Sequence, residues 1–505
     1  MIIMPTTNYY IPPELLKMLE LPYGYSLLLK GEGGVGKSTL ALELLVKSKG
    51  KNATYISTRV SPSQLFEHFP WIQKDVEESF TVLDATQAGT TMNNPLDEGE
   101  QLALKFMGMP DLLQSIVHMA EQASGQLFVV IDSWDAIQLM FEHLQAQKYA
   151  DKPQMTENLN FMYNVFMSLV RQKNIKLILV AENASMMDYL VDGVVELRRE
   201  FLPNTKMVRI AELKKFRGIR ITNTSYLFSL EEGRFKAFFP WDVELVKDFR
   251  GSLVKLEYDE KTLHSIVESI LLNQIPMQMG ALSIDDMHKE FINIVIDGLA
   301  RFQLKRNEMF TFTPPDNFDI LMFKNKMLSY LEKEDIDPER YYKNIRIHLF
   351  DIASDQVRSE RNVVDIPIPD KKLGDQEQVM QLLNLFAKKI SSYGTEGNFK
   401  HSINIGYLLP FETKIKNLDI AANTFFSTFS KLFKIPNSIF IMATNSSDKF
   451  IQEIYKMANF CVDISFFQGT PLMNVISPHV PSLFGFLIPP DQEPQRKKLY
   501  IHSIV

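Results

Sequence analysis

Short runs of apolar or β-branched residues alternate with longer amphipathic stretches along the first half of the chain. The runs lie at residues 26–29, 53–58, 127–131 and 177–181, and the amphipathic stretches begin near Ser38, at 111–123 and at 158–171. Continuous apolar runs of this length are typical of strands in a parallel sheet that is covered on both faces. Their alternation with helices predicts an α/β fold with right-handed crossovers.

A different pattern follows after about residue 190. Short runs of mixed polarity lie at 193–197, 207–213, 226–230 and 234–238, the last two being separated by Glu231-Glu232-Gly233. We predict that these runs form antiparallel strands and a hairpin appended to the parallel sheet. Beyond them, apolar stripes at helical spacing, as at residues 263–270, predict a helical connecting region over 241–300.

The second half repeats the first in outline. Helices are predicted over 376–390 and 418–433, and strands over 403–409, 439–443 and 461–464. Residues 444–446 follow a predicted strand in the same way as residues 182–184. Residues 461–464 then resemble 193–196 in their pattern. We therefore predict three segments, which are a first α/β domain at 1–240, the helical region at 241–300 and a second α/β domain at 301–505.

A glycine-rich loop follows the first apolar run. Residues 31–38 read Gly-Glu-Gly-Gly-Val-Gly-Lys-Ser, which fits the pattern G-x-x-x-x-G-K-[ST] of a P-loop between a strand and a helix. Glycines let backbone N–H groups converge on phosphate oxygens, and the helix N-terminus adds partial positive charge. The predicted nucleotide-binding residues are Gly31, Gly33, Gly34, Val35, Gly36, Lys37, Ser38 and Thr39. Lys37 would reach the β- and γ-phosphates of ATP, and the Ser38 hydroxyl would bind Mg²⁺.

An acidic partner for the metal is expected at the end of another buried strand. Asp132 follows the run 127–131 directly. A carboxylate at the carboxyl end of a parallel strand points into the ligand crevice. Asp132 is therefore the predicted second Mg²⁺ ligand, with Ser38 as the first.

The amino-acid composition excludes some classes of protein but does not indicate a particular reaction. The 505 residues carry 54 Lys and Arg against 61 Asp and Glu, a formal net charge of −7, which argues against binding nucleic acid over the whole surface. Cys461 is the single cysteine, which is typical of a reducing compartment. The apolar runs are shorter than the ~18 residues of a membrane helix, and the first ten residues lack a signal-peptide pattern. We expect a cytoplasmic protein without a membrane segment.

Taken together, these motifs resemble RecA-superfamily ATPases of the KaiC-like group. The resemblance covers residues 11–240 and rests on the loop 31–42, the run 129–133 and the segments 192–197 and 213–218. Within that group the chain is most similar to the archaeal gas-vesicle regulator family GvpD, through residues 55–62, 69–71 and 234–240. The resemblance implies a RecA-like P-loop NTPase core, a mostly parallel sheet with antiparallel C-terminal hairpins, followed by a second, degenerate RecA-like α/β domain.

The KaiC-like group also implies residues that act between subunits. Its Lys-x-Arg pair on a late hairpin reaches the γ-phosphate bound by a neighbouring subunit, and the matching residues here are Lys215 and Arg217. This implies a homo-oligomer whose subunits complete one another's catalytic sites. The alternative is an ordinary solvated basic hairpin.

One departure from that pattern bears on hydrolysis. KaiC-like ATPases place two glutamates after the second strand, whereas this chain has Arg59 and Val60. Loss of a positioned base typically costs ~10²–10⁴ in rate, so we expect ATP to be hydrolysed slowly or not at all. Arg59 either touches the γ-phosphate or is a surface residue. Glu182, which follows the run 177–181, either orients the attacking water or is structural.

The second half shows no phosphate-binding loop. The predicted strand 310–313 runs into Pro314-Pro315, and prolines remove the N–H donors that a phosphate loop needs. The run 405–409, near the position of Asp132 in the repeat, carries no acid. This domain is expected to serve packing or partner binding.

Three functions compete at this point. An ATP-binding regulatory switch with weak or absent ATPase activity fits best, and the resemblance to GvpD implies a transcription regulator as its protein partner. An active RecA-like ATPase working on DNA is the alternative, which the missing glutamates and the net negative charge disfavour. A small-molecule kinase would need an acceptor site for which no motif is present.

Overall fold

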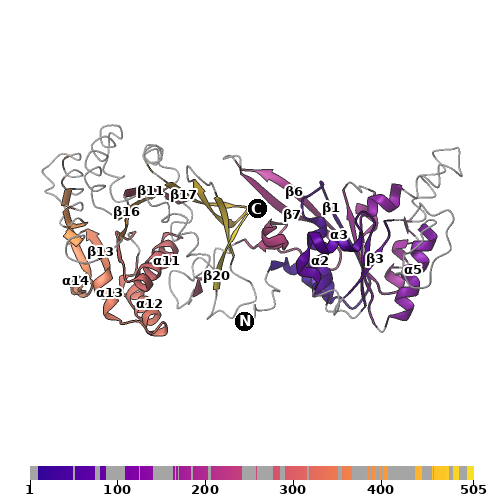
Figure 1. Cartoon of the computed structure of the whole chain (residues 1–505), viewed down its shortest axis with the longest axis horizontal. Coiled ribbons are helices and arrows are strands. Elements are labelled where there is room, and N and C mark those ends of the chain that lie inside the picture. Colours follow the sequence, from indigo (N-terminus) through magenta and orange to yellow (C-terminus); the bar gives the residue numbers. More distant parts are fainter. Residues whose placement is uncertain are drawn as a thin grey trace. The chain divides into compact units, whose positions relative to one another are not determined.

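The computed structural model divides the chain into two compact units, with the boundary between Pro240 and Trp241 (Figure 1). The structure describes residues 10–48, 52–73, 80–86, 109–123, 125–139, 186–202, 206–240, 277–284, 291–315, 318–350, 355–366, 402–407, 438–445, 460–476, 482–487 and 498–504, most of 163–182, parts of 377–399, and residues 257, 258 and 458. The predicted helix at 418–433 and the apolar stripe at 263–270 lie outside these residues. Within the described part, no helix has the length and apolar character needed to cross a membrane.

The first unit is built on a nine-stranded sheet with the order β3-β2-β4-β5-β1-β6-β7-β8-β9. Its strands are β1 Tyr25–Gly31, β2 Ala53–Ser57, β3 Thr81–Asp84, β4 Phe128–Asp132, β5 Lys176–Ala181, β6 Gly193–Phe201, β7 Met207–Phe216, β8 Ser225–Ser229 and β9 Lys236–Phe238. The strands from β3 to β6 pair in parallel, and β7, β8 and β9 continue as an antiparallel ladder. A RecA-like core with antiparallel C-terminal hairpins is thus confirmed.

Two details of the first sheet differ from the sequence-based prediction. The run beginning at Gly193 was predicted to be antiparallel, and β6 does pair antiparallel with β7, but on its other side it pairs in parallel with β1. The edge strand β3 was not predicted, because it is short and only Leu83 within it is buried. A strand at the edge of a sheet shows little of the apolar pattern that identifies a central one.

Helices cover both faces of the first sheet. They are α1 Pro13–Glu20, α2 Lys37–Lys47, α3 Pro62–His68, α5 Met109–Gln122 and α8 Met187–Leu190, with short 3₁₀ turns η2 Pro70–Ile72 and η3 Glu231–Gly233. Figure 1 shows α2 and α5 on opposite faces. Leu28, Val129 and Ile131 of the sheet share one core with Ile116 of α5. Covering of the sheet on both faces explains the continuous apolar runs within β1, β4 and β5.

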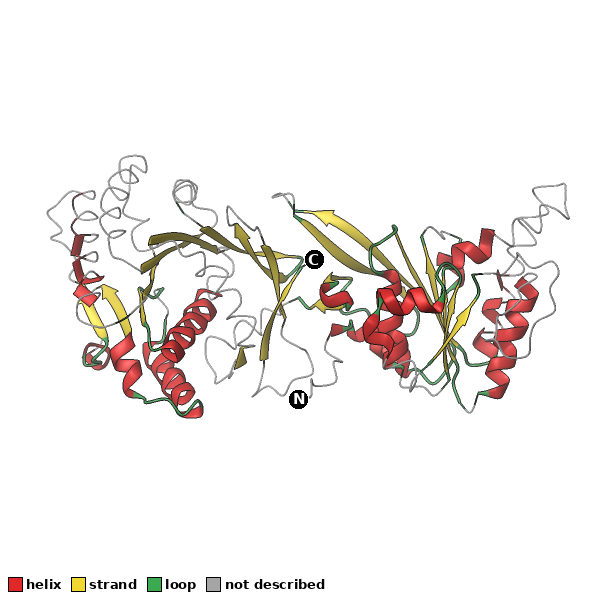
Figure 2. Cartoon of the chain, viewed as in Figure 1, coloured by secondary structure: helices red, strands yellow, loops and turns green. Residues whose placement is uncertain are grey.

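The second unit is built on an eleven-stranded sheet with the order β10-β20-β19-β18-β17-β11-β16-β15-β12-β13-β14. Its strands are β10 Glu257–Tyr258, β11 Met277–Ile284, β12 Met309–Phe312, β13 Ile345–Phe350, β14 Val363–Ile366, β15 Ser402–Tyr407, β16 Ser438–Asn445, β17 Phe460–Phe467, β18 Thr470–Ile476, β19 Ser482–Leu487 and β20 Lys498–Ser503. The helices α11 Phe291–Arg306, α12 Ile320–Lys333 and α13 Glu339–Asn344 pack against this sheet (Figure 2), and α14 covers Asp355–Arg358.

The second sheet repeats the strand order of the first. In both, a central strand lies between two parallel neighbours, and antiparallel strands continue on one side: β11 corresponds to β1, β16 to β5, β15 to β4, β12 to β2 and β17 to β6. The second unit is therefore a RecA-like α/β domain with additional strands. This correspondence agrees with the sequence mirroring of 461–464 onto 193–196.

The prediction of a helical region over 241–300 is wrong for two segments. Both β10 and β11 lie within it, and β11 is the central strand of the second sheet. Only α11, from Phe291, continues the predicted helical pattern in the described residues. The sequence of β11, Met-Gln-Met-Gly-Ala-Leu-Ser-Ile, is poor in β-branched residues, so its propensity for a strand is weak and tertiary pairing decides its conformation.

In the second unit, the position equivalent to the P-loop also differs from the predicted one. We predicted it after residues 310–313, but β12 corresponds to the second strand of the fold, so the equivalent position in the sequence follows β11. Residues 285–290 there read Asp-Asp-Met-His-Lys-Glu, which contain no glycine and no G-K-[ST] motif. The expected loss of phosphate-binding sequence in the second unit holds, although it concerns different residues.

Candidate functional site

The loop between β1 and α2 has a backbone that glycine makes possible. Gly31 has φ 145°, and a Cβ there would lie 2.0 Å from the carbonyl oxygen of Leu197 on the neighbouring strand β6. Gly36, at the N-cap of α2, has φ 112°, a left-handed conformation that other residues rarely adopt. The P-loop motif thus lies between a strand and a helix, as the sequence predicted, and the helix begins at Lys37.

Lys37 is directed back over this loop. Its side chain is largely buried, and Nζ donates hydrogen bonds to the carbonyl oxygens of Gly31 at 2.6 Å and Glu32 at 2.7 Å. Burial lowers the pKa of Lys37, and the carboxylates of Glu182 and Asp132 act in the opposite direction. An ammonium group held over a loop of backbone N–H groups suits the phosphates of a nucleotide.

A cavity of about 300 Å³ opens at this loop. It is lined by Gly33, Gly34, Gly36, Lys37, Ser38, Thr39, Tyr55, Arg59, Val60, Leu65, His68, Phe69, Asp132, Ser133, Asp135, Val180, Glu182 and Leu230. Most of these residues lie at or beyond the carboxyl ends of four parallel strands, β1, β2, β4 and β5, which is where α/β sheets bind ligands. The volume is at the lower end of the range for small-molecule sites.

Ser38 and Asp132 both line the cavity, so the two predicted Mg²⁺ ligands share one site. Tyr55 of β2, which is fully buried, donates a hydrogen bond of 2.5 Å to Oδ2 of Asp132. Burial and the charge of Asp132 raise the pKa of Tyr55 well above its usual value, so the phenol stays a donor. A hydroxyl and an oriented carboxylate are oxygen ligands of the kind that Mg²⁺ prefers, so the residues present fit the metal.

Three further charged residues meet on the same cavity. Nη1 of Arg59, in the loop after β2, donates to Oε1 of Glu182, just past β5, at 2.7 Å. Nη2 of Arg59 lies 3.7 Å from Oδ2 of Asp135, and that oxygen also accepts from the backbone N–H of Glu182 at 2.8 Å. The hydrogen bond from Arg59 holds the pKa of Glu182 below its usual range. Glu182 is therefore an ionised partner of Arg59 in this structure.

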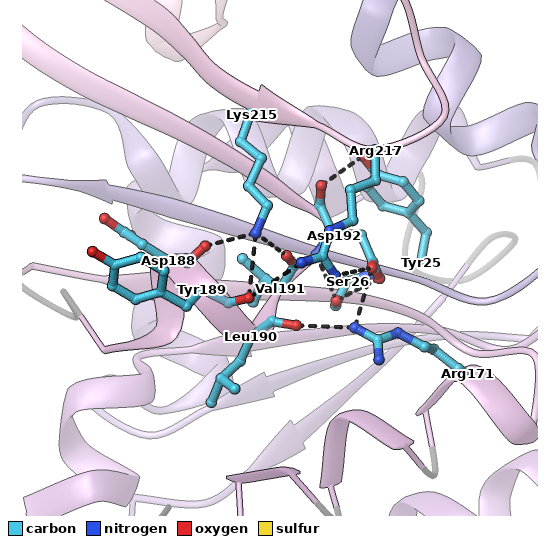
Figure 3. Close-up of polar contacts among 10 residues, drawn as sticks. All are labelled: Tyr25, Ser26, Arg171, Asp188, Tyr189, Leu190, Val191, Asp192, Lys215 and Arg217. Atoms are coloured by element: carbon cyan, nitrogen blue, oxygen red, sulfur yellow. Dashed lines mark hydrogen bonds and ion pairs between the residues drawn. The ribbon is translucent and has the colours of Figure 1, made fainter.

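Lys215 and Arg217 do not line this cavity, and Figure 3 shows them directed towards the segment from Asp188 to Asp192. Lys215 pairs with Val194 of β6, which in turn pairs with Leu28 of β1, so it lies nearer the amino-terminal end of β1 than the P-loop does. Its Nζ donates to the carbonyl oxygens of Val191 at 2.7 Å and Asp188 at 2.8 Å. Within one chain the structure does not bring these cations to the phosphate loop, and their action on a neighbouring subunit stays a prediction.

Asp192 holds the region around Arg217 together. Its Oδ2 accepts from the backbone N–H and hydroxyl of Ser26 at 3.1 and 2.8 Å, and its Oδ1 lies 3.2 Å from Arg171 and 3.4 Å from Arg217 (Figure 3). Arg217 also donates its backbone N–H to the Asp192 carbonyl at 2.9 Å. This network ties β1, β6 and the end of β7 together beside α8.

Sequence reasoning missed Tyr55 and Asp135 in the cavity. Tyr55 lies within the predicted second strand, and its contact with Asp132 spans 77 residues of sequence. Asp135 comes three residues after Asp132 and was a detectable candidate, because acids just past a parallel strand reach the same edge of the sheet. The pairing of Arg59 with Glu182 could not be predicted from neighbouring residues, because the two lie 123 residues apart in the sequence.

Comparisons with known proteins address the same segment. The family model of the GvpD gas vesicle protein P-loop domain matches residues 16–213. GvpD1 and GvpD2 of Halobacterium salinarum are each 29% identical to this chain, over 255 and 236 residues, which is 49% and 46% of this chain. Each alignment covers 45% of the relative, so the chain spans less than half the length of these curated relatives.

Among solved structures, a KaiC-like protein from Pyrococcus horikoshii OT3 is similar to this chain with 16% identity and a TM-score of 0.32, covering 43% of this chain and 91% of that one. The stretch that matches the GvpD domain contains the whole P-loop and Asp132, and it ends before Lys215. The resemblance to the GvpD family drawn from the motifs is confirmed. Residues 16–213 of this chain are similar to the P-loop domain of the GvpD gas vesicle protein family.

Proposed function

We propose that this chain is an ATP-binding regulatory switch that hydrolyses ATP slowly or not at all. The observation that carries the proposal is the single cavity in which Lys37, Ser38 and Asp132 meet at the glycine-rich loop. Its backbone N–H groups and Lys37 would hold the phosphates, and Ser38 and Asp132 would hold Mg²⁺. The bound metal would neutralise phosphate charge and orient the nucleotide.

Slow hydrolysis is supported by the charges around the cavity. Where the KaiC-like resemblance implies carboxylates, this chain has Arg59 and Val60, and both line the cavity. The remaining candidate base, Glu182, accepts a hydrogen bond from Arg59, which lowers its pKa. A carboxylate of lowered pKa is a weaker acceptor for the proton of an attacking water.

A switch also needs a consequence of nucleotide binding. We propose that Lys215 and Arg217 contact the nucleotide of a second copy of this chain, so that ATP favours a homo-oligomer. A protein partner, a transcription regulator by resemblance to GvpD, would then bind one nucleotide state in preference to the other.

Lys37→Ala tests the binding claim. Removing the ammonium deletes charge-assisted hydrogen bonds to the phosphates, so ATP affinity should fall at least about 100-fold in equilibrium binding. The matched control is Lys173→Ala, because Lys173 is an exposed lysine of the same unit, paired with Glu121 and absent from the cavity lining.

The same preparation measures hydrolysis. Single-turnover assays with excess wild-type protein should show ATP that is bound but hydrolysed far more slowly than once per second. Turnover of several per second would contradict slow hydrolysis, and a rate that rises strongly with added DNA would favour the DNA-associated ATPase instead. Unchanged ATP affinity in Lys37→Ala would refute the assigned site.

A further inference from the structure

Arg59 is held at the cavity by two carboxylates from different parts of the sheet. Glu182 contacts it at 2.7 Å, and Asp135 lies 3.7 Å away. The side chains of Arg59 and Glu182 are each about half exposed, at 48% and 47%. Exposed ion pairs contribute little stability, so this pair can be exchanged for a stronger partner at small cost.

We propose that Arg59 senses the γ-phosphate, and that Glu182 and Asp135 hold its guanidinium when no third phosphate is present. This inference rests on the ATP binding proposed above and assigns the selectivity of that site. Arg59 would be a specificity-determining residue that distinguishes ATP from ADP.

The chemistry of the two partners favours this exchange. A guanidinium presents two parallel N–H groups that match phosphate oxygens, and a terminal phosphate carries more negative charge than a single carboxylate. Arg59 lines the same cavity as Lys37 and Ser38, so its guanidinium and the ammonium of Lys37 act on one small region.

ADP offers Arg59 no comparable partner. The P-loop backbone and Lys37 suffice for the two phosphates that ADP and ATP share. Arg59 then stays on Glu182, and its contribution to binding appears only for ATP. In the KaiC-like pattern, one of the two glutamates at the positions of Arg59 and Val60 activates water. Here Arg59 would instead recognise whether the bound nucleotide is ATP or ADP.

The test measures the affinities of ADP and of a non-hydrolysable ATP analogue, in Mg²⁺, by calorimetric titration of the full chain. Arg59→Ala should weaken binding of the analogue about tenfold and leave ADP within about twofold. Glu182→Gln should raise selectivity for the analogue about threefold, because the guanidinium is no longer held. The double variant should have the same selectivity as Arg59→Ala alone, because without the guanidinium of Arg59 there is no group for Glu182 to hold.

Arg361→Ala is the matched control. Arg361 is an exposed arginine paired with Glu339 at 2.9 Å in the second unit, and its loss should leave both affinities unchanged. If Arg59→Ala weakens both nucleotides equally, or neither, the inference is wrong while the proposed function stands. A selectivity gain from Glu182→Gln that persists without Arg59 would refute the holding role. If wild-type protein binds neither nucleotide, the proposed function itself fails.

Discussion

At the scale of single residues, the cavity works through pairs that the chain brings together from distant segments. Tyr55 orients Asp132, Arg59 engages Glu182, and Lys37 lies over the carbonyls of its own loop. Each pair fixes the direction of one charged group before any ligand binds. For Asp132 such preorganisation reduces the cost of ordering the side chain on binding, whereas Arg59 would have to leave Glu182 to contact a γ-phosphate.

Asp132→Asn should reduce the dependence of ATP binding on Mg²⁺. Loss of the carboxylate charge weakens the metal ligand, so we expect the ratio of ATP affinities with Mg²⁺ and with a chelator to fall about tenfold. The control is Asp84→Asn, because Asp84 also ends a parallel strand, β3, but does not line the cavity. The same ratio in wild type and Asp132→Asn would argue against Asp132 as the metal ligand.

The phosphate loop and Asp132 could be predicted because their chemistry lies in contiguous sequence. Eight contiguous residues, from the end of β1 to the start of α2, carry the loop motif, and the residue directly after an apolar run supplies the acid. The bonds from Tyr55 to Asp132 and from Arg59 to Glu182 cross 77 and 123 residues of sequence. Only the order of strands brings those partners together, and a single sequence does not show that order.

At the scale of elements, α1 is anchored to the antiparallel part of the first sheet by one buried acid. Oε1 of Glu14 accepts hydrogen bonds from the backbone N–H of Thr222, at 2.9 Å, and from the Thr222 hydroxyl. Oε2 accepts from the phenol of Tyr226 at 2.7 Å. Burial raises the pKa of Glu14, but the hydrogen bonds outweigh it, and the net pKa lies below its ordinary value of 4.5.

A lowered carboxyl pKa gives stability that depends on pH. The contribution of Glu14 is fully present above 4.5, its ordinary value, and is lost as the pH falls through the lower pKa of the folded state. Glu14→Gln should therefore lower the free energy of unfolding by roughly 2 kcal/mol at pH 7, and by progressively less as the pH falls below that value.

The free energy of unfolding is measured by urea unfolding, followed by the fluorescence of Trp71 and Trp134 in the first unit. A Trp241→Phe background removes the third tryptophan of the chain. Glu20→Gln, an exposed position at the end of the same helix, is the control and should change little. A destabilisation by Glu14→Gln that is the same at pH 4 and pH 7 would show that the charge of Glu14 plays no part.

Prediction of the elements succeeded where burial on both faces leaves a pattern. The apolar runs of β1, β4 and β5 could be placed within two residues of the ends of these strands. β11 could not, because its methionine, glutamine, glycine and alanine residues do not favour a strand. Its pairing with β16 and β17 holds it in the sheet, and those partners lie about 160 to 180 residues later in the chain.

At the scale of the whole molecule, two units share one strand order but differ in chemistry. The first carries the phosphate loop, and the sequence after β11 in the second lacks one. Because the sequence contains one G-x-x-x-x-G-K-[ST] loop, the proposed switch would produce a cooperative response through communication between copies. Lys215 and Arg217, which lie away from the cavity of their own chain, are the residues proposed to provide it.

The central claim is that nucleotide state controls the assembly of copies of this chain. The most direct test measures the mass of the assembly that the full chain forms, by light scattering under three conditions, which are ATP with Mg²⁺, ADP, and no nucleotide. We predict a larger assembly with ATP that Arg217→Ala weakens. Arg171→Ala is the control, because Arg171 contacts the same oxygen of Asp192 but lies outside the Lys-x-Arg pair. An identical mass under all three conditions, in a protein shown to bind ATP, would contradict the account.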